Sequence, residues 1–582
     1  MAQSRGLGGL QFSRRALLGT AAATFGLPVA ARERRSHNWH KETDVIVVGG
    51  GAAGCVAAAT ARAAGAQVFL CEKAGFLGGT SAKSGGGYWI PNNFDLRARG
   101  IADPKADFLR YTARYSYPSV YDPRHPTLGL PEATYRLLTA FYDHADEMLQ
   151  SMDSLGALHS TAYAIETATG IAYSPDYLEH VPENVAPRGR MVVPKRADGS
   201  IGAGDELMAQ LTAHARRAGV RIFLDAPVID LVQESDRAVT GVIVRTDAGP
   251  RSFRARRGVI FCSGGYVHDG DLVREYQPFP ILGRCALPTC TGDFVRLGVR
   301  AGAQLGNMAG AWRAQCLVEQ ALLYPSLPME VWWPIGDSMF VVNKYGRRCF
   351  NENRNYHDRT RESYLFDANN AEYPNLLTFP IYDRRTAERF AGNYPLPDEP
   401  LGESYVISAD TLEGLAAALD ARLSTITAHT GGVRLDSSFV QALKDTYIRF
   451  NGYAREGRDP DFDRGRYPYD VEVQSSEQVP RSGTNWPPNP YPSPVMHPLL
   501  DTGPYFTMIL GPAVLDTNGG PVIDPTGAVL DTAGQPIPGL YGAGNCIASP
   551  AANSYWGGGA TLGAAMTFGY VAGRSAAGRR ES

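Results

Sequence analysis

The chain has 582 residues, of which 44% are hydrophobic and 20% charged, and its formal net charge is −3. This length exceeds one ordinary hydrophobic core, so we expect at least two domains or one large, elaborated domain. The charge balance argues against a nucleic-acid partner, and the eight cysteines show neither a CxxC pair nor the spacing of a zinc site, so we expect no metal and no disulfide framework.

The first 31 residues have the form of an export signal. Arg14 and Arg15 precede a short, weakly apolar run that ends in small residues and is too short to span a bilayer. The pair resembles a twin-arginine signal, although Leu17 and Gly19 stand where phenylalanine and lysine are frequent. We therefore expect an exported, periplasmic protein without stable membrane insertion. The alternative is an amphipathic arm on a cytoplasmic protein.

A dinucleotide-binding unit follows in "TDVIVVGGGAAGCVAAATARAAGAQVFLCEK". Residues 45–48 predict a short buried strand, Gly49, Gly51 and Gly54 form GxGxxG, and an Ala-rich helix leads to a strand that ends at Glu72. The first glycine makes the turn, the second admits a pyrophosphate, and the third lets the helix pack on the strand. The helix N-terminus faces the phosphates, and Glu72 is placed to accept the ribose hydroxyls.

Later segments predict further parts of the same sheet. "GGTSAKSGGGYWIPNN" (78–93) is a second loop rich in glycine and hydroxyl groups, at a point where an ordinary NAD domain would continue its sheet. The segments 219–232 and 258–267 are typical of strands, and "GLYGAGNC" (539–546) is typical of a late strand with a glycine turn. A sheet completed by segments this distant implies that other material is inserted between them.

Near the C-terminus, "NSYWGGGATLGAAMTFGYVAG" (553–573) places two aromatic residues against a glycine triplet and then an apolar helical run. Glycines allow close approach of the backbone to a ligand, and a helix start offers unpaired N–H groups. The stretch therefore predicts a ligand-facing loop, with a tight turn around a buried tyrosine as the alternative.

From about Trp39 onward, the chain resembles the flavoprotein family that holds fumarate reductases and 3-ketosteroid dehydrogenases. The matching pieces occur in the family's order: "VVGGGAAG", "GGTSAKSGGG", "TGDFVRLGVRAGAQLGNMAGAW", "VVNKYGRRCFNE", "SADTLEGLAA", "GRDPDFDRG" and "GLYGAGN". The resemblance implies FAD, bound in an extended conformation between two domains, with the flavin ring near the glycine loops at 78–87 and 557–563.

The resemblance implies an α/β fold, in which a doubly wound, Rossmann-type FAD-binding domain carries an inserted α+β catalytic (substrate) domain. We place the FAD-binding domain at 40–310, with an insertion at about 95–200, and its return at 501–582. The catalytic domain is expected at 311–500, after the signal-like segment 1–31.

The residues expected to bind FAD lie in glycine-rich loops, at strand ends and in the first turns of helices. They are Gly49, Gly51, Ala52, Ala53, Gly54, Glu72, Lys73, Gly79, Thr80, Ser81, Ser84, Gly85, Gly86, Val228, Gly264, Asp293, Gly544, Asn545, Ala560, Thr561 and Leu562. The alternative for Asp293 is that it is only a turn residue. The family usually has glycine where Phe294 stands.

The residues that hold a dicarboxylate in fumarate reductases are replaced in this chain. Their acid, an arginine four residues beyond the glutamate of the "NE" motif, corresponds to Tyr356. Their second arginine corresponds to Ser554, and "AVLDTNGG" (513–520) lacks their substrate-binding histidine. Reduction of a small dicarboxylate needs positive charge to hold it, so we do not expect it here.

The replacements resemble the 1,2-dehydrogenases of 3-ketosteroids. In that branch a tyrosine hydroxyl and a glycine N–H four residues later hold the ketone oxygen, and Tyr555 and Gly559 stand at those positions, with Trp556 where proline is usual. Donors at that oxygen stabilise the negative charge that develops there. By the same resemblance Tyr356 is the base, acting as a tyrosinate. Packing alone is the alternative for both tyrosines, and the polar segment around Tyr356 predicts a loop.

A free tyrosine titrates near 10 and needs help to act as a base at neutral pH. In the family a second tyrosine donates a hydrogen bond to the base, and three residues are candidates for this role, Tyr163, Tyr173 and Tyr177, of which we prefer Tyr177. His357 and Arg354 could also lower the pKa of Tyr356 by supplying positive charge.

The resulting hypothesis is an FAD-dependent oxidoreductase that introduces a C=C bond next to a ketone in a cyclic, apolar substrate of steroid-like shape. A tyrosine takes the proton, and the flavin takes a hydride. One alternative is an exported reductase of an activated C=C bond, and another is a protein that binds FAD without turnover. No haem motif (CxxCH) is present, so we expect an external electron acceptor or donor.

Overall fold

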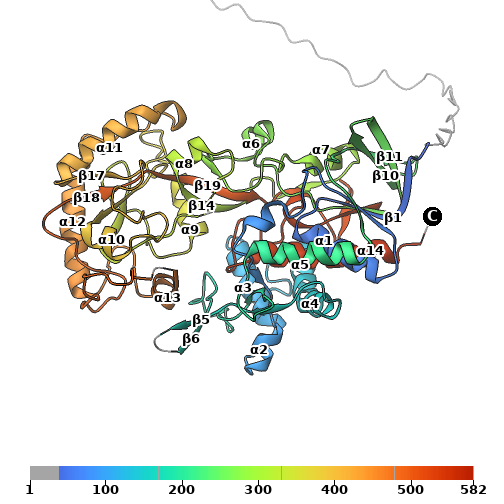
Figure 1. Ribbon diagram of the computed structural model, residues 1–582, viewed down its shortest axis with the longest axis horizontal. Helices are drawn as coiled ribbons and strands as arrows, with labels where there is room; N and C mark the ends of the chain where they lie inside the picture. The colour runs from blue at the N-terminus through green and yellow to red at the C-terminus, as the bar shows by residue number, and fades with distance from the viewer. Residues whose placement is uncertain (1–37, 168–169, 329–330, 478, 581–582) are drawn as a thin grey trace, which may run out of the picture. The chain divides into compact units, whose positions relative to one another are not determined.

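The structure is a computed structural model that describes residues 38–167, 170–328, 331–477 and 479–580 (Figure 1). The signal-like segment 1–31 lies outside these described residues. The described residues all belong to the unit His37–Ser582.

Eight strands form the largest sheet, in the order β21-β22-β11-β1-β2-β8, with β10 paired to β11 and β9 paired to β10. They are β1 (Lys41–Val48), β2 (Val68–Cys71), β8 (Arg221–Phe223), β9 (Val228–Gln233), β10 (Val239–Thr246), β11 (Gly249–Phe261), β21 (Ala528–Leu530) and β22 (Pro536–Gly542). The central strands are apolar runs rich in valine and isoleucine, which suit a parallel sheet that is buried on both faces.

The parallel strands of this sheet end at one common edge. β1 is parallel to β2 and β11, and β11 is parallel to β22. Val48 pairs with Cys71 and Phe261, and Phe261 pairs with Gly542. The expectation that segments far apart in the sequence complete one sheet is therefore confirmed. Open α/β sheets bind ligands at this carboxyl edge.

Two strand boundaries in the dinucleotide-binding unit differ from the prediction. β1 starts at Lys41 rather than at residue 45, because its polar first residues still pair with β11. β2 ends at Cys71, one residue before Glu72, whose backbone N–H donates to the carbonyl of Phe223 while its carboxylate turns towards the glycine loop.

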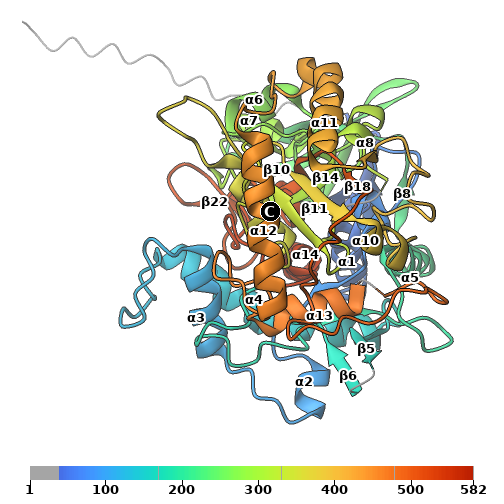
Figure 2. The same cartoon turned by 90° about the vertical axis from the view of Figure 1, so that its left-hand side faces the viewer.

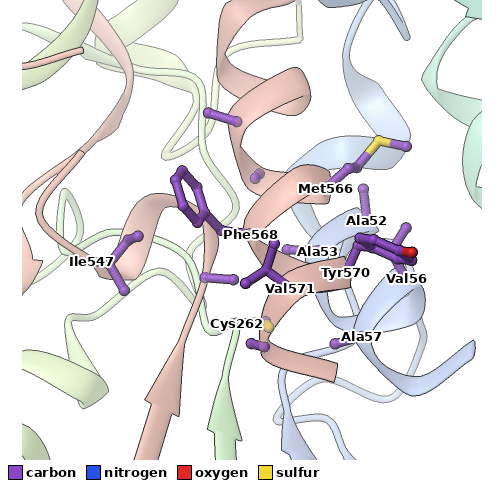
Figure 3. Close-up of a cluster of buried hydrophobic side chains, with 14 of the residues drawn as sticks. Ala52, Ala53, Val56, Ala57, Cys262, Ile547, Met566, Phe568, Tyr570 and Val571 are labelled. Atoms are coloured by element: carbon purple, nitrogen blue, oxygen red, sulfur yellow. The ribbon is translucent and has the colours of Figure 1, made fainter. Parts of the chain in front are cut away.

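Helix α14 (Ala560–Gly578) packs closely on helix α1 (Ala52–Ala63) beside this sheet (Figure 3). A Cβ atom at Gly569 would lie 2.5 Å from the carbonyl oxygen of Ala53, and one at Gly573 would lie 2.7 Å from that of Ala57. The glycines therefore let the two helix backbones approach each other. Figure 3 shows Met566 of α14 beside Ala52 of α1. The predicted helix after the glycine triplet is confirmed.

The remaining strands form smaller sheets. The sheet β15-β16-β18-β17 contains β15 (Met339–Val342), β16 (Phe379–Asp383), β18 (Tyr505–Thr507) and β17 (Ile407–Ala409). A three-stranded sheet contains β12 (Gly283–Arg284), β19 (Leu510–Thr517) and β14 (Ala311–Leu317), and another contains β3 (Tyr88–Trp89), β7 (Met191–Pro194) and β4 (Ser160–Ala162). Two pairs are β5 (Ala164–Thr167) with β6 (Gly170–Tyr173), and β13 (Leu305–Gly306) with β20 (Gly520–Pro521).

Along the chain, the other α-helices of the described ranges occur in the segments that connect strands of the largest sheet. They are α2 (Phe94–Ala98), α3 (Lys105–Ser116), α4 (Glu132–Ser154), α5 (Gly204–Arg217), α6 (Gly270–Tyr276), α7 (Asp293–Arg300), α8 (Val318–Leu323), α9 (Tyr356–Arg361), α10 (Arg384–Arg389), α11 (Leu412–Ile426), α12 (Phe439–Glu456) and α13 (Pro468–Glu477). None of the helices in these ranges has the length and apolarity needed to cross a membrane.

The segment between β14 and β19 builds hydrophobic clusters of its own. Two clusters draw their buried side chains from residues between Leu317 and Leu510 and are separate from the main cluster around β1 and α1. Figure 1 shows helices α10, α11 and α12 on the side opposite α1 and α14, and Figure 2 shows α11 and α12 from that side. The boundaries at 310 and 500 stay a prediction.

Candidate active site

Two adjoining hollows lie at the carboxyl edge of the largest sheet. We call the smaller, of about 110 Å³, the glycine cleft, and the larger, of about 800 Å³, the tyrosine cavity. The described residues that line both are Thr80, Ser81, Asp516, Asn545, Thr561 and Leu562. A ligand that occupies the cleft can therefore extend into the cavity.

The glycine cleft brings together most of the residues predicted to bind the dinucleotide. Those that line it are Gly49, Gly51, Ala52, Ala53, Glu72, Lys73, Gly79, Thr80, Ser81, Val228, Gly264, Asp293, Gly544, Asn545, Thr561 and Leu562. Ser84, Gly85 and Gly86 line the tyrosine cavity instead. Gly54 and Ala560 are buried and line neither hollow.

The three glycines of GxGxxG differ in their surroundings. A Cβ at Gly54 would lie 1.9 Å from the carbonyl oxygen of Gly49, so this glycine lets the helix pack on the strand. A Cβ at Gly51 would meet only Ser81 Oγ, at 3.5 Å, and Gly78 O, at 3.9 Å. The space beside Gly51 is therefore open in the protein itself, and a dinucleotide's pyrophosphate fits there at the start of α1.

Glu72 is held where a ribose would lie. Its Oε2 accepts a hydrogen bond from Gly50 N at 2.7 Å, and its Oε1 accepts one from Ala74 N at 2.7 Å. Burial raises the pKa of Glu72, while these backbone hydrogen bonds act in the opposite direction. Each carboxylate oxygen keeps a further lone pair, so the group can still accept hydrogen bonds from ribose hydroxyls.

Lys73 and Asp293 form an ion pair at the wall of the glycine cleft. Lys73 Nζ lies 3.0 Å from Asp293 Oδ2 and also donates to the hydroxyl of Thr291. Asp293 begins α7, where the helix dipole favours a negative charge. Phe294 is fully buried and stacks on Phe261 with centroids 4.2 Å apart, so this departure from the family pattern fills the core.

Tyr177, Tyr356 and Tyr555 meet in the wall of the tyrosine cavity. Their ring centroids lie 5.5 Å (Tyr177–Tyr356), 5.2 Å (Tyr177–Tyr555) and 5.6 Å (Tyr356–Tyr555) apart. After burial, the nearby hydroxyl groups of Tyr177 and Tyr555 also raise the pKa of Tyr356. Tyr163 and Tyr173 line the cavity too, but Tyr173 lies under the guanidinium of Arg99, at 3.7 Å. Of the three candidates, Tyr177 is the one that packs on Tyr356.

Tyr356 is the first residue of helix α9, which corrects the prediction of a loop. Asn355 caps the helix by accepting a hydrogen bond from Asp358 N at 2.9 Å. The segment is polar throughout, so the sequence did not distinguish this capped helix from a loop. The side chain of Tyr356 is buried, with 7% relative exposure. Burial raises the pKa of Tyr356 well above its ordinary value.

The neighbours of Tyr356 do not supply the positive charge that the sequence suggested. His357 Nδ1 accepts a hydrogen bond from Arg313 N at 3.1 Å, which leaves the proton on Nε2 for the carbonyl of Asn553. Burial lowers the pKa of His357 to about 4, so the ring is neutral at neutral pH. Arg354 lies 3.2 Å from the carboxylate of Asp470, and its charge is compensated there.

Gly559 is the last residue of the glycine triplet, and Tyr555 precedes the triplet by two residues. Gly559 has φ +87°, and a Cβ there would lie 2.5 Å from Tyr88 N, so only glycine fits. No described residue accepts a hydrogen bond from the Gly559 amide. The Tyr555 hydroxyl accepts one from Thr561 Oγ1 at 3.2 Å. Both groups line the cavity, where they can donate to an oxygen of a ligand.

Trp556 fixes the position of this loop through contacts with buried residues. Its indole stacks on Phe141, with centroids 5.6 Å apart, and its Nε1 donates to Ser116 Oγ at 2.8 Å. Its carbonyl accepts hydrogen bonds from the Tyr111 hydroxyl at 2.6 Å and from Tyr177 N at 3.1 Å. The tryptophan that replaces the usual proline thus fills an aromatic pocket and ties Tyr177 to the loop that carries Tyr555.

Tyr469 and Asp516 are among the site residues that the sequence analysis did not identify. Tyr469, in α13, lines the cavity and packs on Tyr177 with centroids 5.7 Å apart. Asp516 lines both hollows, accepts hydrogen bonds from Gly265 N at 2.8 Å and Asn545 Nδ2 at 3.2 Å, and has its pKa raised to about 6 by burial. No sequence motif around either residue indicates its role, because only the tertiary fold brings each of them to the site.

Comparisons with known proteins identify the family of this site. A family described as "FAD binding domain" matches residues 44–562. A 3-oxosteroid 1-dehydrogenase of Mycolicibacterium smegmatis is 29% identical over 91% of this chain and 96% of its own. A 4-oxocyclohexanecarboxylate 2-dehydrogenase of Sinomonas cyclohexanicum is also 29% identical, over 92% of this chain and 93% of its own.

The fold has a counterpart among solved structures. A 3-ketosteroid Δ1-dehydrogenase from Sterolibacterium denitrificans, in complex with 1,4-androstadiene-3,17-dione, superposes with a TM-score of 0.73 at 24% identity and covers 92% of this chain and 99% of its own. With the family match over nearly the whole chain, these observations lead to one conclusion. The chain belongs to the FAD binding domain family of flavoproteins, and its cofactor is FAD.

Proposed function

We propose that the protein is an FAD-dependent dehydrogenase that introduces a C=C bond next to a ketone in a cyclic, apolar substrate. The observation that carries this proposal is the meeting of three tyrosines, Tyr177, Tyr356 and Tyr555, in one aromatic cavity that adjoins the dinucleotide cleft. The relatives named for 3-oxosteroid and 4-oxocyclohexanecarboxylate substrates support a cyclic ketone.

The proposed roles of the tyrosines follow from the acidity of a ketone. The proton on the carbon next to the carbonyl is poorly acidic unless the carbonyl oxygen can carry negative charge. Tyr555 Oη and Gly559 N would donate hydrogen bonds to that oxygen and stabilise the charge. Tyr356 Oη would accept the proton, and Tyr177, whose ring packs on that of Tyr356, would hold it in position.

The residues of the glycine cleft fit FAD. Glu72 would hold the ribose, the amides at the start of α1 beside Gly51 would hold the pyrophosphate, and the loops at 78–87 and 557–563 would flank the ring system. When bound, FAD supplies the acceptor for the hydride that leaves the substrate. The aromatic wall of the cavity excludes water from the ketone and favours apolar rings.

Anaerobic titration of the purified holoprotein with 3-ketosteroids, with monocyclic ketones and with fumarate or succinate tests this proposal. We expect a ketone to bleach the flavin absorbance and succinate to leave it unchanged. Reduction of fumarate by the protein with a low-potential dye as electron donor would contradict the proposed reaction, because arginine is missing at positions 356 and 554. The proposed reaction would also be contradicted if none of the ketones bleached the flavin absorbance.

Tyr555→Phe is expected to slow flavin reduction by a ketone about 30- to 1,000-fold and to weaken enone binding. The reason is the loss of one hydrogen bond to developing negative charge, which costs about 2–4 kcal/mol. Stopped-flow measurement of flavin bleaching separates binding from chemistry. The matched control is Tyr453→Phe in α12, whose hydroxyl contacts Asp461 at 3.2 Å. A Tyr555→Phe variant with normal binding and rate would mean that Tyr555 only packs.

We also propose that an external electron acceptor reoxidises the flavin and that the mature protein is exported. The motivation for export is the Arg14-Arg15 pair ahead of a short apolar run, which resembles a twin-arginine signal. Export by that route would let the protein fold around FAD before it crosses the membrane.

A further inference from the structure

Lys83 places a cationic side chain in the wall of the tyrosine cavity, which also contains the carboxylates of Glu472 and Asp516. Among the described residues that line this cavity, it is the single lysine or arginine. Its Nζ donates to Ser326 Oγ at 2.8 Å and to Leu327 O at 2.6 Å, and both acceptors are uncharged. An ammonium group has three N–H donors, so one remains for a ligand. The charge of Lys83 is thus not balanced by any carboxylate of the described residues.

The two carboxylates in the cavity wall have other partners: Glu472 forms an ion pair with Arg188, and Asp516 accepts hydrogen bonds from Gly265 N and Asn545 Nδ2.

Lys73 gives the contrast within the same chain. It lines the glycine cleft, where its charge is balanced by Asp293 at 3.0 Å. Lys83 does not line that cleft but only the tyrosine cavity. Lys83 forms no ion pair with a carboxylate of the described residues and lines the cavity that we assign to the substrate. It is therefore placed to meet a negative charge on the substrate rather than on the dinucleotide's phosphates.

We propose that Lys83 binds a carboxylate of the substrate, so that the substrate class is a cyclic ketone that carries a carboxylate group. This inference rests on the proposed function, because it assigns the tyrosine cavity to the ketone. Tyr555 and Gly559 would hold the ketone oxygen, while Lys83 would hold the carboxylate through a charge-assisted hydrogen bond. The relative named for 4-oxocyclohexanecarboxylate has a substrate with both groups on one ring.

The test compares two ligands that differ in one charge. The dissociation constants of 4-oxocyclohexanecarboxylate and of its uncharged methyl ester are measured by perturbation of the flavin spectrum in wild-type holoprotein and in Lys83→Met. We expect wild type to bind the acid more tightly than the ester. Lys83→Met should weaken binding of the acid about 10- to 100-fold and leave the ester within about twofold.

Two variants and a second readout complete this test. Lys83→Arg should retain the preference for the acid, and Lys444→Met, whose lysine pairs with Glu413 on the surface of α12, should behave as wild type. The FAD content and midpoint potential of Lys83→Met should equal those of wild type. Equal loss of both ligands, or a shifted potential, would assign Lys83 to the flavin and overturn the inference.

The outcome separates this inference from the proposed function. Flavin bleaching by uncharged ketones with no preference for the acid would refute the role of Lys83 and leave the dehydrogenase intact. Binding of the acid that depends on Lys83, without bleaching by any ketone, would support the anion site and refute the proposed reaction.

Discussion

Replacement of Tyr356 by phenylalanine is expected to lower the rate constant of flavin reduction by a ketone about 10²- to 10⁴-fold, while ligand affinity stays within a few-fold. A positioned general base contributes a factor of this size. Phenylalanine keeps the ring that packs on Tyr177 and Trp333 and removes only the hydroxyl. Stopped-flow bleaching at several ketone concentrations gives the rate constant and the dissociation constant separately.

The pH dependence of the same rate gives a second check on Tyr356. Burial raises the pKa of Tyr356 well above its usual value near 10, so the hydroxyl is protonated at neutral pH. Because only the deprotonated form accepts a proton, the active fraction grows about tenfold per pH unit below that pKa. The wild-type rate should therefore rise from about pH 7 to about pH 10 without a plateau. A flat profile, or a Tyr356→Phe variant with the wild-type rate, would mean that another group takes the proton.

Gly51→Val is expected to abolish FAD binding, so that the purified variant is colourless. A Cβ at this position meets no protein atom closer than 3.5 Å, so the side chain should not prevent folding. It would instead occupy the space that the pyrophosphate needs beside the start of α1. The absorbance near 450 nm relative to that at 280 nm measures the FAD content, and circular dichroism shows that the variant is folded.

The matched control for Gly51→Val is Gly452→Val in α12. A Cβ atom at Gly452 would have no heavy atom within 4 Å, and this glycine lies far from the glycine cleft in the sequence. This control should keep its full FAD content. A yellow, folded Gly51→Val protein would show that the pyrophosphate lies elsewhere.

The sequence by itself determined the dinucleotide-binding unit. The strand, the three glycines and the helix of residues 45–63 are contiguous, so the signal comes from backbone geometry within one short segment. The turn needs glycine at position 49, where φ is +107°, and the helix packing needs glycine at position 54. Both requirements can therefore be recognised in the sequence as conspicuous glycines. The resemblance extended this local interpretation to FAD and to the tyrosines at 356 and 555.

Only the tertiary structure decided how the tyrosine cavity is built and charged. Tyr177, Tyr356 and Tyr555 come from segments hundreds of residues apart, and Tyr469 joins them from α13 without any motif. Burial keeps His357 neutral, and the backbone of Arg313 and Asn553 sets its tautomer, which no local pattern reveals. Burial and hydrogen-bond partners set the charge of each group, and both arise from contacts between distant segments rather than from neighbours in the chain.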